Sequence, residues 1–417
     1  YQIKALRQAI EEDPRNPRYI LTAHRIGFRL VTPGAAVAAA KPSALVGRKT
    51  EIQFLQTRYE QAAKGHRQFV FVNGEAGIGK TALIDDWLAR LQIEAASTRV
   101  YRGHSPEVTG ESEAYQPILD ALARGIRRED GEALRDQLRR SAPSWLRQLT
   151  GLLTTEEVET LQRITAGIPP ERQRREFAEM LEAFSADQPV VLVIEDIHWS
   201  DASSIALLGL IAQREEAARL LVVCTCRAVD AIVNQHPARA LQLSLAARGC
   251  AQLLHLGPLP ADDARQLIAH HLSGAGRELS EQILQRGGGH PLFLVHLAQF
   301  LSQRGAHNAA APLADQDVPP RLRELIELQL SQLAPSQQLL LEIGAVAGVE
   351  FAAAAVAAGS GLTVEAVEVS LESIALRQQF IAERGLVIWP DGTVSGRFYF
   401  RHALYAQVPV SYTHLTL

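Results

Sequence analysis

The sequence predicts an α/β fold in which helices cover a parallel β-sheet, and three observations lead to this prediction. Continuous apolar runs at 189–196 (PVVLVIED) and 219–227 (RLLVVCTCR) are typical of strands buried on both faces of a parallel sheet. A shorter run at 69–72 (FVFV) is followed by a glycine-rich turn and a predicted helix from Lys80 to about Leu91. Long helical stretches separate these strands, which favours strand–helix–strand units.

Helical patterns fill most of the remaining chain. Residues 127–185 are helix-rich and charged, which indicates an insertion or a helical cover. The pattern at 258–303 is helical throughout, whereas 319–407 is helical at first and then predicts a hairpin around 390–392 (PDG). Residues 33–44 are rich in Pro and Ala without a period, so they predict a linker.

The composition excludes several classes of protein. A length of 417 residues favours two or three domains. With 47% hydrophobic and 21% charged residues, the chain fits neither an intrinsically disordered protein nor a coiled-coil rod. Lys and Arg total 42 against 46 Asp and Glu, a net charge of −4. This balance excludes a uniformly basic protein that coats nucleic acid, although a local basic patch remains compatible with it.

Cysteine usage and hydropathy bear on location. The three cysteines form no disulfide framework, which favours a reducing compartment and therefore the cytoplasm. The most apolar stretch, 345–361, is interrupted by Glu350 and is too short and too weakly apolar to span a bilayer. The chain does not open on a signal peptide. We therefore expect no membrane partner.

The segment 74–81 (GEAGIGKT) matches the phosphate-binding pattern GxxxxGK[ST] between a strand and a helix. Glycines let backbone N–H groups curl around phosphate oxygens, and the dipole of the following helix favours an anion. The lysine would reach the β- and γ-phosphates, and the threonine hydroxyl would bind Mg²⁺. We therefore expect ATP and Mg²⁺ as cofactors. The predicted contacts are Gly74, Glu75, Ala76, Gly77, Ile78, Gly79, Lys80 and Thr81.

A phosphate-binding loop of this kind needs an acidic strand end that holds Mg²⁺ and polarises water. The run 191–196 (VLVIED) supplies Glu195, near the metal, and Asp196, which is better placed to orient the attacking water. Many such sites carry Asp first, so the division of roles between these two carboxylates stays open. Arg227 ends the next apolar strand and is a candidate sensor of the γ-phosphate, the alternative being a surface arginine.

Taken together, several stretches resemble the bacterial AAA-type ATPase module of the STAND class, whose members are signal-transduction ATPases that act as switches. The resemblance covers roughly residues 45–408. The stretches that carry it are LVGRKTEIQFL (45–55), GEAGIGKT (74–81), VLVIEDIHWSDASSIALL (191–208), VVCTCR (222–227), HLGPLPADDARQLI (255–268), GGGHPLFLVHLAQFL (287–301) and FRHALYAQV (400–408).

This resemblance implies further site residues. Val46, Gly47 and Arg48 match the segment that packs near the adenine. Pro291 matches a lid proline that touches the base, although His290 stands where the family often has Asn. His402 matches a histidine that reaches the nucleotide phosphates. The sequence assigns no arginine finger from a neighbouring subunit, which favours a slow, switch-like ATPase over fast hydrolysis.

Residues 1–32 resemble the C-terminal part of an OmpR-type winged-helix DNA-binding domain. YQIKALRQAI resembles the end of the recognition helix, and PRYILTAHRIGFRLV resembles the β-hairpin wing. The resemblance implies that Lys4 and Arg7 contact the DNA groove or phosphates and that Arg25 is a wing contact. Six cationic and three acidic side chains in 1–32 agree with a DNA partner. The first helices of such a domain are missing from this sequence.

The resemblances give a full division of the chain. We expect a truncated protein that continues into a sensor region for an unknown inducer or partner protein, with ATP-dependent homo-oligomers as one mode of action. The tail at 410–417 resembles a translated sequencing adapter. The expected regions are the winged-helix fragment (1–32), the linker (33–44), the P-loop ATPase domain (45–257), the helical lid (258–310), a winged-helix-like domain (311–409) and the adapter-like tail (410–417).

Three functions remain open at this point. The first is an ATP-binding, slowly hydrolysing transcription regulator that binds DNA through the N-terminal winged helix. The second is a P-loop motor or loader that acts on DNA, which would need steady turnover and an arginine supplied by a neighbouring subunit. The third is a signalling scaffold that holds its nucleotide without hydrolysis, which Glu195 in place of Asp keeps open.

Overall fold

The computed structural model forms two units, Tyr1–Leu45 and Val46–Leu417, and each is described by itself. In the first unit it describes the backbone of residues 20–23 and 27–30, and residue 45. In the second it describes residues 46–107, 113–128, 131–233, 235–272, 276–303, 318–331, 333–376, 380–389, 394–402 and 404–408.

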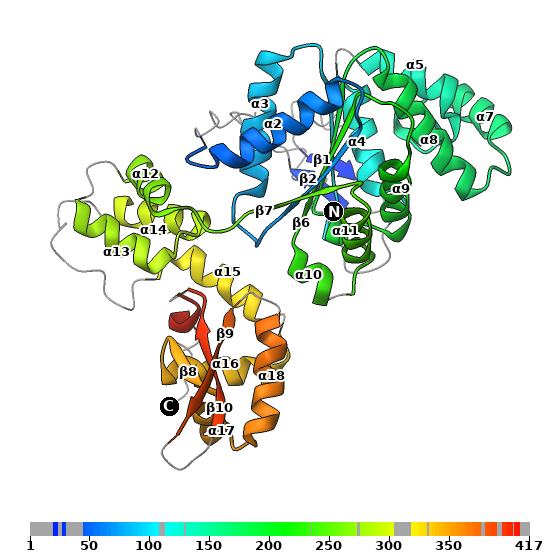
Figure 1. Cartoon of the computed structure of the whole chain (residues 1–417). Coiled ribbons are helices and arrows are strands. Elements are labelled where there is room, and N and C mark those ends of the chain that lie inside the picture. Colours follow the sequence, from blue (N-terminus) through cyan, green and yellow to red (C-terminus); the bar gives the residue numbers. More distant parts are fainter. Residues whose placement is uncertain are drawn as a thin grey trace. The chain divides into compact units, whose positions relative to one another are not determined.

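Strands and helices alternate between residues 49 and 255, and the described part of the chain beyond them is mostly helical with three further strands (Figure 1). The strands are β1 Ile20–Ala23, β2 Gly27–Leu30, β3 Gln68–Asn73, β4 Arg99–His104, β5 Val190–Glu195, β6 Leu220–Cys226, β7 Gln252–His255, β8 Glu350–Ala352, β9 Ile381–Ile388 and β10 Val394–Phe400. The helices up to β7 are α2 Lys49–Ala63, α3 Lys80–Glu94, α4 Gln116–Ile126, α5 Gly131–Ser141, α6 Pro143–Leu146, η1 Thr150–Leu152, α7 Thr155–Ile164, α8 Pro170–Ser185, η2 Ile197–Trp199, α9 Ala202–Gln213, α10 Ala228–Val233 and α11 Pro237–Ala247. The later helices are α12 Ala261–His271, α13 Arg277–Gly287, α14 Pro291–Gln303, α15 Pro320–Ser331, α16 Pro335–Ala347, α17 Ala353–Ser360 and α18 Val364–Leu376.

In the first unit, β1 and β2 form the antiparallel pair that the sequence predicts. Ile20 pairs with Leu30 and Ala23 with Gly27. Lys4, Arg7 and Arg25, the expected DNA contacts, lie outside the described residues, as does the expected linker. The DNA-binding domain therefore stays a prediction.

The central sheet has five parallel strands in the order β4-β5-β6-β3-β7. The predicted strands β3, β5 and β6 are confirmed and occupy the interior of the sheet. The sequence did not predict β4 and β7, which are the two edge strands of this sheet. An edge strand has a neighbour on one side only, so it can carry exposed polar residues such as Gln252 and His255 and loses the apolar signature.

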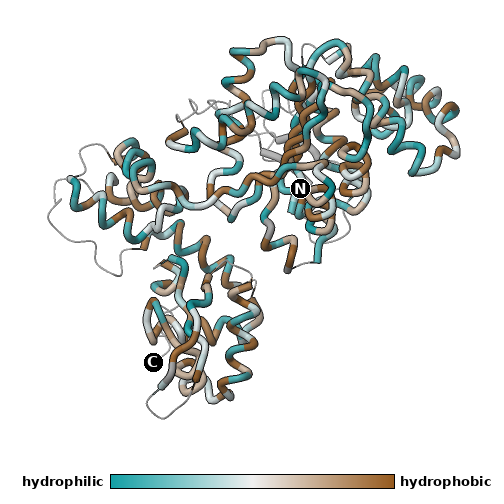
Figure 2. Tube along the Cα trace, viewed as in Figure 1, coloured by the Kyte–Doolittle hydropathy of each residue, from teal (hydrophilic) through white to brown (hydrophobic). Residues whose placement is uncertain are grey.

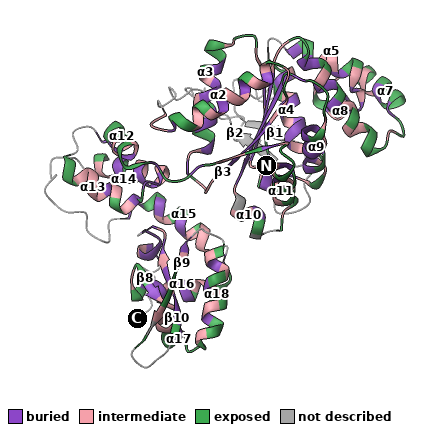
Figure 3. Cartoon of the chain, viewed as in Figure 1, coloured by how far each residue is buried: buried purple, intermediate pink, exposed green. Residues whose placement is uncertain are grey.

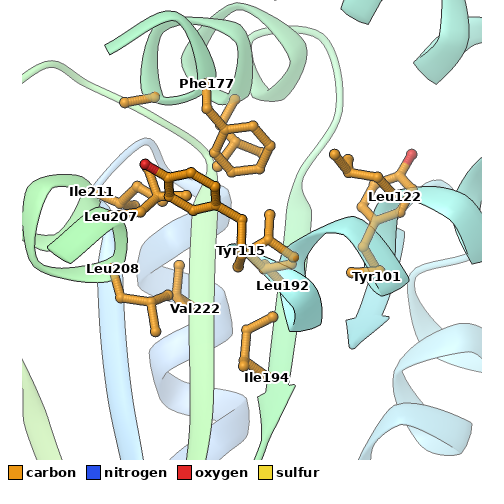
Figure 4. Close-up of a cluster of buried hydrophobic side chains, with 14 of the residues drawn as sticks. Tyr101, Tyr115, Leu122, Phe177, Leu192, Ile194, Leu207, Leu208, Ile211 and Val222 are labelled. Carbon is orange, nitrogen blue, oxygen red and sulfur yellow. The ribbon is translucent and has the colours of Figure 1, made fainter. Parts of the chain in front are cut away.

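Helices cover both faces of this sheet (Figure 1). Helices α2 and α3 pack on one face, and α4, α8, α9 and α11 are gathered on the other. Because successive strand residues point to opposite faces, alternate residues such as Leu192 and Ile194 enter one core with Tyr115 and Phe177 (Figure 4). The apolar strands form the brown and purple centre of the domain in Figures 2 and 3.

The predicted helix-rich character of 127–185 is confirmed by α5–α8, and aromatic side chains of this segment anchor it to the sheet domain. Trp145 is fully buried, with its ring 4.4 Å from that of Phe177 and 4.8 Å from that of Tyr115. The Trp145 indole donates a hydrogen bond of 2.8 Å to the carbonyl of Gln173 on α8. These contacts join the helical cover to the core that positions β5.

Helices α12–α14 and the segment from α15 to β10 share a second hydrophobic core. It extends from Leu259 to Val408 and joins residues on both sides of the expected boundary at 310. The predicted hairpin is confirmed as β9 and β10, which form an antiparallel sheet in the order β8-β10-β9. The short strand β8 was not predicted.

Among the described helices, none is by itself both long and apolar enough to cross a membrane. The consecutive helices α17 and α18 meet that criterion only as a pair, and the chain bends by 115° between them.

Candidate active site

The glycine-rich loop connects β3 to α3 at the carboxyl edge of the parallel sheet. Gly77 (φ 75°) and Gly79 (φ 100°) adopt the left-handed backbone region that favours glycine. Gly79 is also the N-cap of α3. The first N–H groups of α3 have no partner within the helix, so this end of the helix favours an anion.

Lys80, the first residue of α3, is only 7% exposed and turns back onto the loop. Its Nζ donates hydrogen bonds to the carbonyls of Gly74 (2.9 Å) and Glu75 (2.8 Å). Burial, followed by the nearby Arg227 charge, lowers the pKa of Lys80 to about 8. At neutral pH the ammonium is still mostly protonated, and it lies beside the loop where phosphate oxygens would bind.

Thr81 and Glu195 meet directly, as the sequence predicts for a metal site. The Thr81 hydroxyl donates a 2.9 Å hydrogen bond to Glu195 Oε2, although the two residues are 114 positions apart. Glu195 is 7% exposed and ends β5. Hydroxyl and carboxylate oxygens are hard donors that suit Mg²⁺.

No cluster of three or more His, Cys, Asp or Glu side chains with metal-ligand geometry occurs in the described part of the chain. Mg²⁺ is usually held by one or two protein groups and completes its octahedral shell with substrate phosphates and water. Thr81 and Glu195 therefore fit the ion, and the loop geometry fits a nucleoside triphosphate.

Asp196 differs from its neighbour in conformation and contacts. Its backbone is left-handed (φ 53°), and its N–H donates a 2.8 Å hydrogen bond to Thr225 Oγ1. The Asp196 carboxylate is 22% exposed and lies 3.9 Å from His104 Nδ1 and from His198 Nδ1. The structure thus separates the carboxylates, with Glu195 on the Thr81 hydroxyl and Asp196 turned towards two imidazoles.

Arg227 follows β6, and a buried histidine links it to the end of β5. Its backbone N–H donates to His198 Nδ1 (3.3 Å), and His198 Nε2 lies 3.6 Å from Asp230 Oδ2. Burial, followed by the Arg227 charge, lowers the pKa of His198 to about 3, so this imidazole is neutral at pH 7. The Arg227 guanidinium itself lies 3.5 Å from Asp230 Oδ2.

The segment expected near the adenine contacts the loop through Arg48. Arg48 Nη2 donates hydrogen bonds to the carbonyls of Ile78 and Gly257, and Nη1 pairs with Glu51 at 2.9 Å. An added Cβ at Gly47 would lie 2.6 Å from the Asp263 carboxylate on α12. Arg48 therefore contacts the loop and Gly47 lies close to α12. The contact of Val46, Gly47 and Arg48 with a base stays a prediction.

Helix α14 approaches the loop at its N-terminus. His290 Nε2 lies 3.0 Å from the Ala76 carbonyl, and Pro291 begins the helix. An added Cβ at Gly77 would lie 2.7 Å from Leu292 Cδ2, which shows how closely this helix packs on the loop. Burial, followed by the His402 charge, lowers the pKa of His290 to about 3.

The expected phosphate-sensing residue His402 lies behind His290. Their ring centroids are 5.4 Å apart, and the His402 ring also packs on Phe293 and Tyr405. Burial lowers the pKa of His402 to about 4. Direct contact between His402 and nucleotide phosphates stays a prediction.

Arg401, the residue before His402, contacts the phosphate-binding loop. Arg401 forms an ion pair of 2.7 Å with Glu75. Burial raises the pKa of Glu75, and the charges of Arg401 and Lys80 oppose that shift. A cavity of about 450 Å³ opens between these groups, within the size range of ligand pockets. Its polar lining includes Glu75, Arg227, Asp230 and Arg401.

Residues 44–223 match the family model described as the AAA ATPase domain. This part of the chain is an AAA ATPase domain. Such a domain implies nucleotide binding, usually with Mg²⁺ and ATP. The matched residues contain the glycine-rich loop, Thr81 and the acidic end of β5.

The known proteins that are similar to this chain match it at low sequence identity. An uncharacterised protein of Rhizobium meliloti (strain 1021) is 24% identical over 330 residues, which cover 73% of this chain and 30% of that protein. The Walker-type ATPase of Pyrococcus abyssi is 13% identical with a TM-score of 0.53, covering 87% of this chain and 95% of that chain. A STAND protein with a tetratricopeptide repeat sensor from Pyrococcus horikoshii is 16% identical with a TM-score of 0.37, covering 88% of this chain and 43% of that chain. The chain thus spans about a third of the curated relative's length.

Two residues that contact the AAA ATPase site were absent from the sequence-based candidates. Arg102 on β4 donates to Glu195, and Arg401 pairs with Glu75. Each had a weak signal: Arg102 is a charge within a short β-branched and aromatic segment, and Arg401 adjoins the candidate His402. Neither signal predicts which residue the arginine contacts, because both contacts join residues far apart in sequence.

Proposed function

We propose that this chain is the ATP-binding switch of a signal-responsive regulator, with slow hydrolysis rather than motor-like turnover. Lys80 and the loop amides would bind the phosphates, and Thr81 and Glu195 would hold Mg²⁺. The ion would supply charge stabilisation to the phosphates. Asp196, neighbour to Glu195 but free of the Thr81 contact, would orient the attacking water, and Arg227 would meet the γ-phosphate.

One observation carries the switch part of this proposal: the segment after β10 contacts the phosphate-binding loop. Arg401 follows β10 of the antiparallel sheet, yet its guanidinium pairs with Glu75 in the loop. His290 reaches the adjacent Ala76 carbonyl. A nucleotide that binds the loop must change these contacts or bind beside them, so its binding energy can bias the position of the C-terminal sheet.

The output that we propose for the switch is DNA binding through the N-terminal region. The antiparallel pair β1–β2 and the cationic excess in 1–32 support this proposal. The sensor for an inducer or partner protein would belong to the longer protein, as the 30% coverage of the Rhizobium relative suggests. An ATP-dependent homo-oligomer is part of the same proposal.

Turnover separates the proposed switch from its two competitors. We expect ATP hydrolysis below about 1 per second, the lower end of the usual enzyme range, with little change on adding DNA. Phosphate release measured at saturating ATP and Mg²⁺, with and without duplex DNA, checks this. Strong DNA-stimulated turnover would favour the motor or loader. Bound ATP recovered intact after prolonged incubation would favour the scaffold.

The substitution Arg401→Gln tests the coupling contact. Losing the ion pair with Glu75 should loosen the C-terminal segment on the loop, and we expect nucleotide to dissociate about tenfold faster, which corresponds to about 1.4 kcal/mol. Stopped-flow displacement of a fluorescent ATP analogue measures this rate. Arg384→Gln is the matched control, because Arg384 pairs with Glu350 in the same antiparallel sheet. Equal dissociation rates in the two variants would contradict the coupling.

A further inference from the structure

Arg102 connects the edge strand of the sheet to the carboxylate expected to hold Mg²⁺. Its Nε donates a 2.5 Å hydrogen bond to Glu195 Oε1, and its Nη1 pairs with Asp85 on α3. The strand register supports this reach, because Arg102 pairs with Val193 and so lies two residues before the level of Glu195. One guanidinium therefore bridges β5 and the helix that begins with Lys80.

The carboxylate of Glu195 is fixed at both oxygens. Oε2 accepts the Thr81 hydroxyl at 2.9 Å, and Oε1 accepts Arg102. The side chain of Glu195 is 9% exposed, and that of Arg102 is 30% exposed. A guanidinium on one oxygen and a hydroxyl on the other hold the buried Glu195 carboxylate in one orientation. Without Arg102 the carboxylate could rotate about its last bond and lose its alignment with the Thr81 hydroxyl.

We propose that Arg102 is a positioning residue that orients Glu195 and so sets the Mg²⁺ affinity of the nucleotide site. This inference rests on the proposed function, because it assumes that Thr81 and Glu195 hold the ion. Groups that hydrogen-bond to metal ligands typically change metal affinity by about 10- to 100-fold when they are removed. Arg102 also places a positive charge beside the ion, so its removal has two opposing effects. Because the hydrogen bond fixes the direction of the Glu195 carboxylate, we expect the loss of orientation to outweigh the loss of charge, and affinity for Mg²⁺ to fall.

The neighbouring arginine Arg124 provides a matched control. Arg102 and Arg124 line the same surface cavity of about 310 Å³ between α3, β4 and α4. Arg124 pairs with Asp120 on its own helix and is 59% exposed. Arg102→Gln and Arg124→Gln thus remove the same charge from the same cavity wall, but only the first removes a donor to Glu195.

The experiment measures the affinity of the full chain for a fluorescent ATP analogue while Mg²⁺ is titrated, and again in EDTA. Mg²⁺ should change the affinity for the ATP analogue, and we expect Arg102→Gln to raise the Mg²⁺ concentration that gives half of this change at least tenfold. In EDTA the affinity of this variant for the analogue should stay within twofold of wild type. Arg124→Gln should match wild type within twofold in both conditions. Arg102→Lys keeps the charge but cannot donate to Glu195 and Asp85 with the same planar fork, so it should resemble Arg102→Gln.

Several results would overturn the inference. If Arg102→Gln and Arg124→Gln shift the Mg²⁺ affinity by the same amount, charge alone sets the affinity. If neither variant shifts it, Arg102 does not influence the Mg²⁺ affinity. Wild-type behaviour of Arg102→Lys would assign the effect to charge. Thermal unfolding of each variant checks folding, and Arg102→Lys carries the test if Arg102→Gln unfolds. A wild-type chain that binds no nucleotide in either condition would overturn the proposed function as well.

Discussion

Replacing Lys80 with Ala should weaken ATP binding about 100-fold or more. The Lys80 ammonium is the buried cation of the loop, and its present partners are the carbonyls of Gly74 and Glu75. Phosphate oxygens would be stronger partners for it, since hydrogen bonds to charged groups contribute about 1.5–3 kcal/mol each. Loss of about 2.7 kcal/mol corresponds to that 100-fold change. Isothermal titration calorimetry with ATP and Mg²⁺ measures it.

Lys64→Ala is the control, because Lys64 is exposed beyond the end of α2. The pH dependence of wild-type binding is a second check. Burial lowers the pKa of free Lys80 to about 8, and a bound phosphate would raise it again. Above pH 8 binding must therefore take up a proton, so affinity should fall with rising pH by up to about tenfold per unit. A wild-type affinity that stays constant to pH 9.5, or a Lys80→Ala variant that binds like Lys64→Ala, would refute this role.

Replacing Gly103 with Val should destabilise the ATPase domain by about 3 kcal/mol, because the added atoms meet backbone rather than a movable side chain. A Cβ on Gly103 would lie 1.8 Å from the Pro117 carbonyl oxygen on α4. Helix α4 would have to leave the edge strand that carries Arg102 and His104. Urea unfolding followed by circular dichroism measures the free energy of unfolding.

Gly151→Val provides the comparison for Gly103→Val. Gly151 is exposed, and an added Cβ there meets nothing within 4 Å. Such a surface change should alter the free energy of unfolding by about 0.5 kcal/mol or less. If both variants unfold at the same urea concentration, the close approach of α4 to β4 does not limit the fold.

The sequence predicted the interior of the sheet far better than its edges. Strands β3, β5 and β6 are buried on both faces, so nearly every residue is apolar and the run is visible without any tertiary information. Strands β4 and β7 have one free edge and mixed burial, so local composition does not identify them. The same limit hid β8, which is only three residues long.

Local motifs also identified most of the candidate site. The spacing of 74–81 depends on backbone geometry within eight consecutive residues, and the acidic end of β5 follows directly from its apolar run. From these two motifs the sequence predicted that Thr81 and Glu195 both lie at the metal, and in the structure the two side chains are hydrogen-bonded. The division of roles between Glu195 and Asp196 was left open by the sequence, and the separate environments of the two carboxylates now support one assignment.

By itself the sequence determined the parallel α/β architecture, the phosphate-binding loop and the acidic strand end, because each depends on short-range patterns of burial or backbone geometry. Only the tertiary structure brought Arg102 to Glu195, 93 residues away, and Arg401 to Glu75. Arg401 follows the last strand of a separate antiparallel sheet. Ion pairs between distant residues leave no periodic or motif signal. They form because chain folding decides which partly buried charges face each other, and each such charge is stable only with a partner.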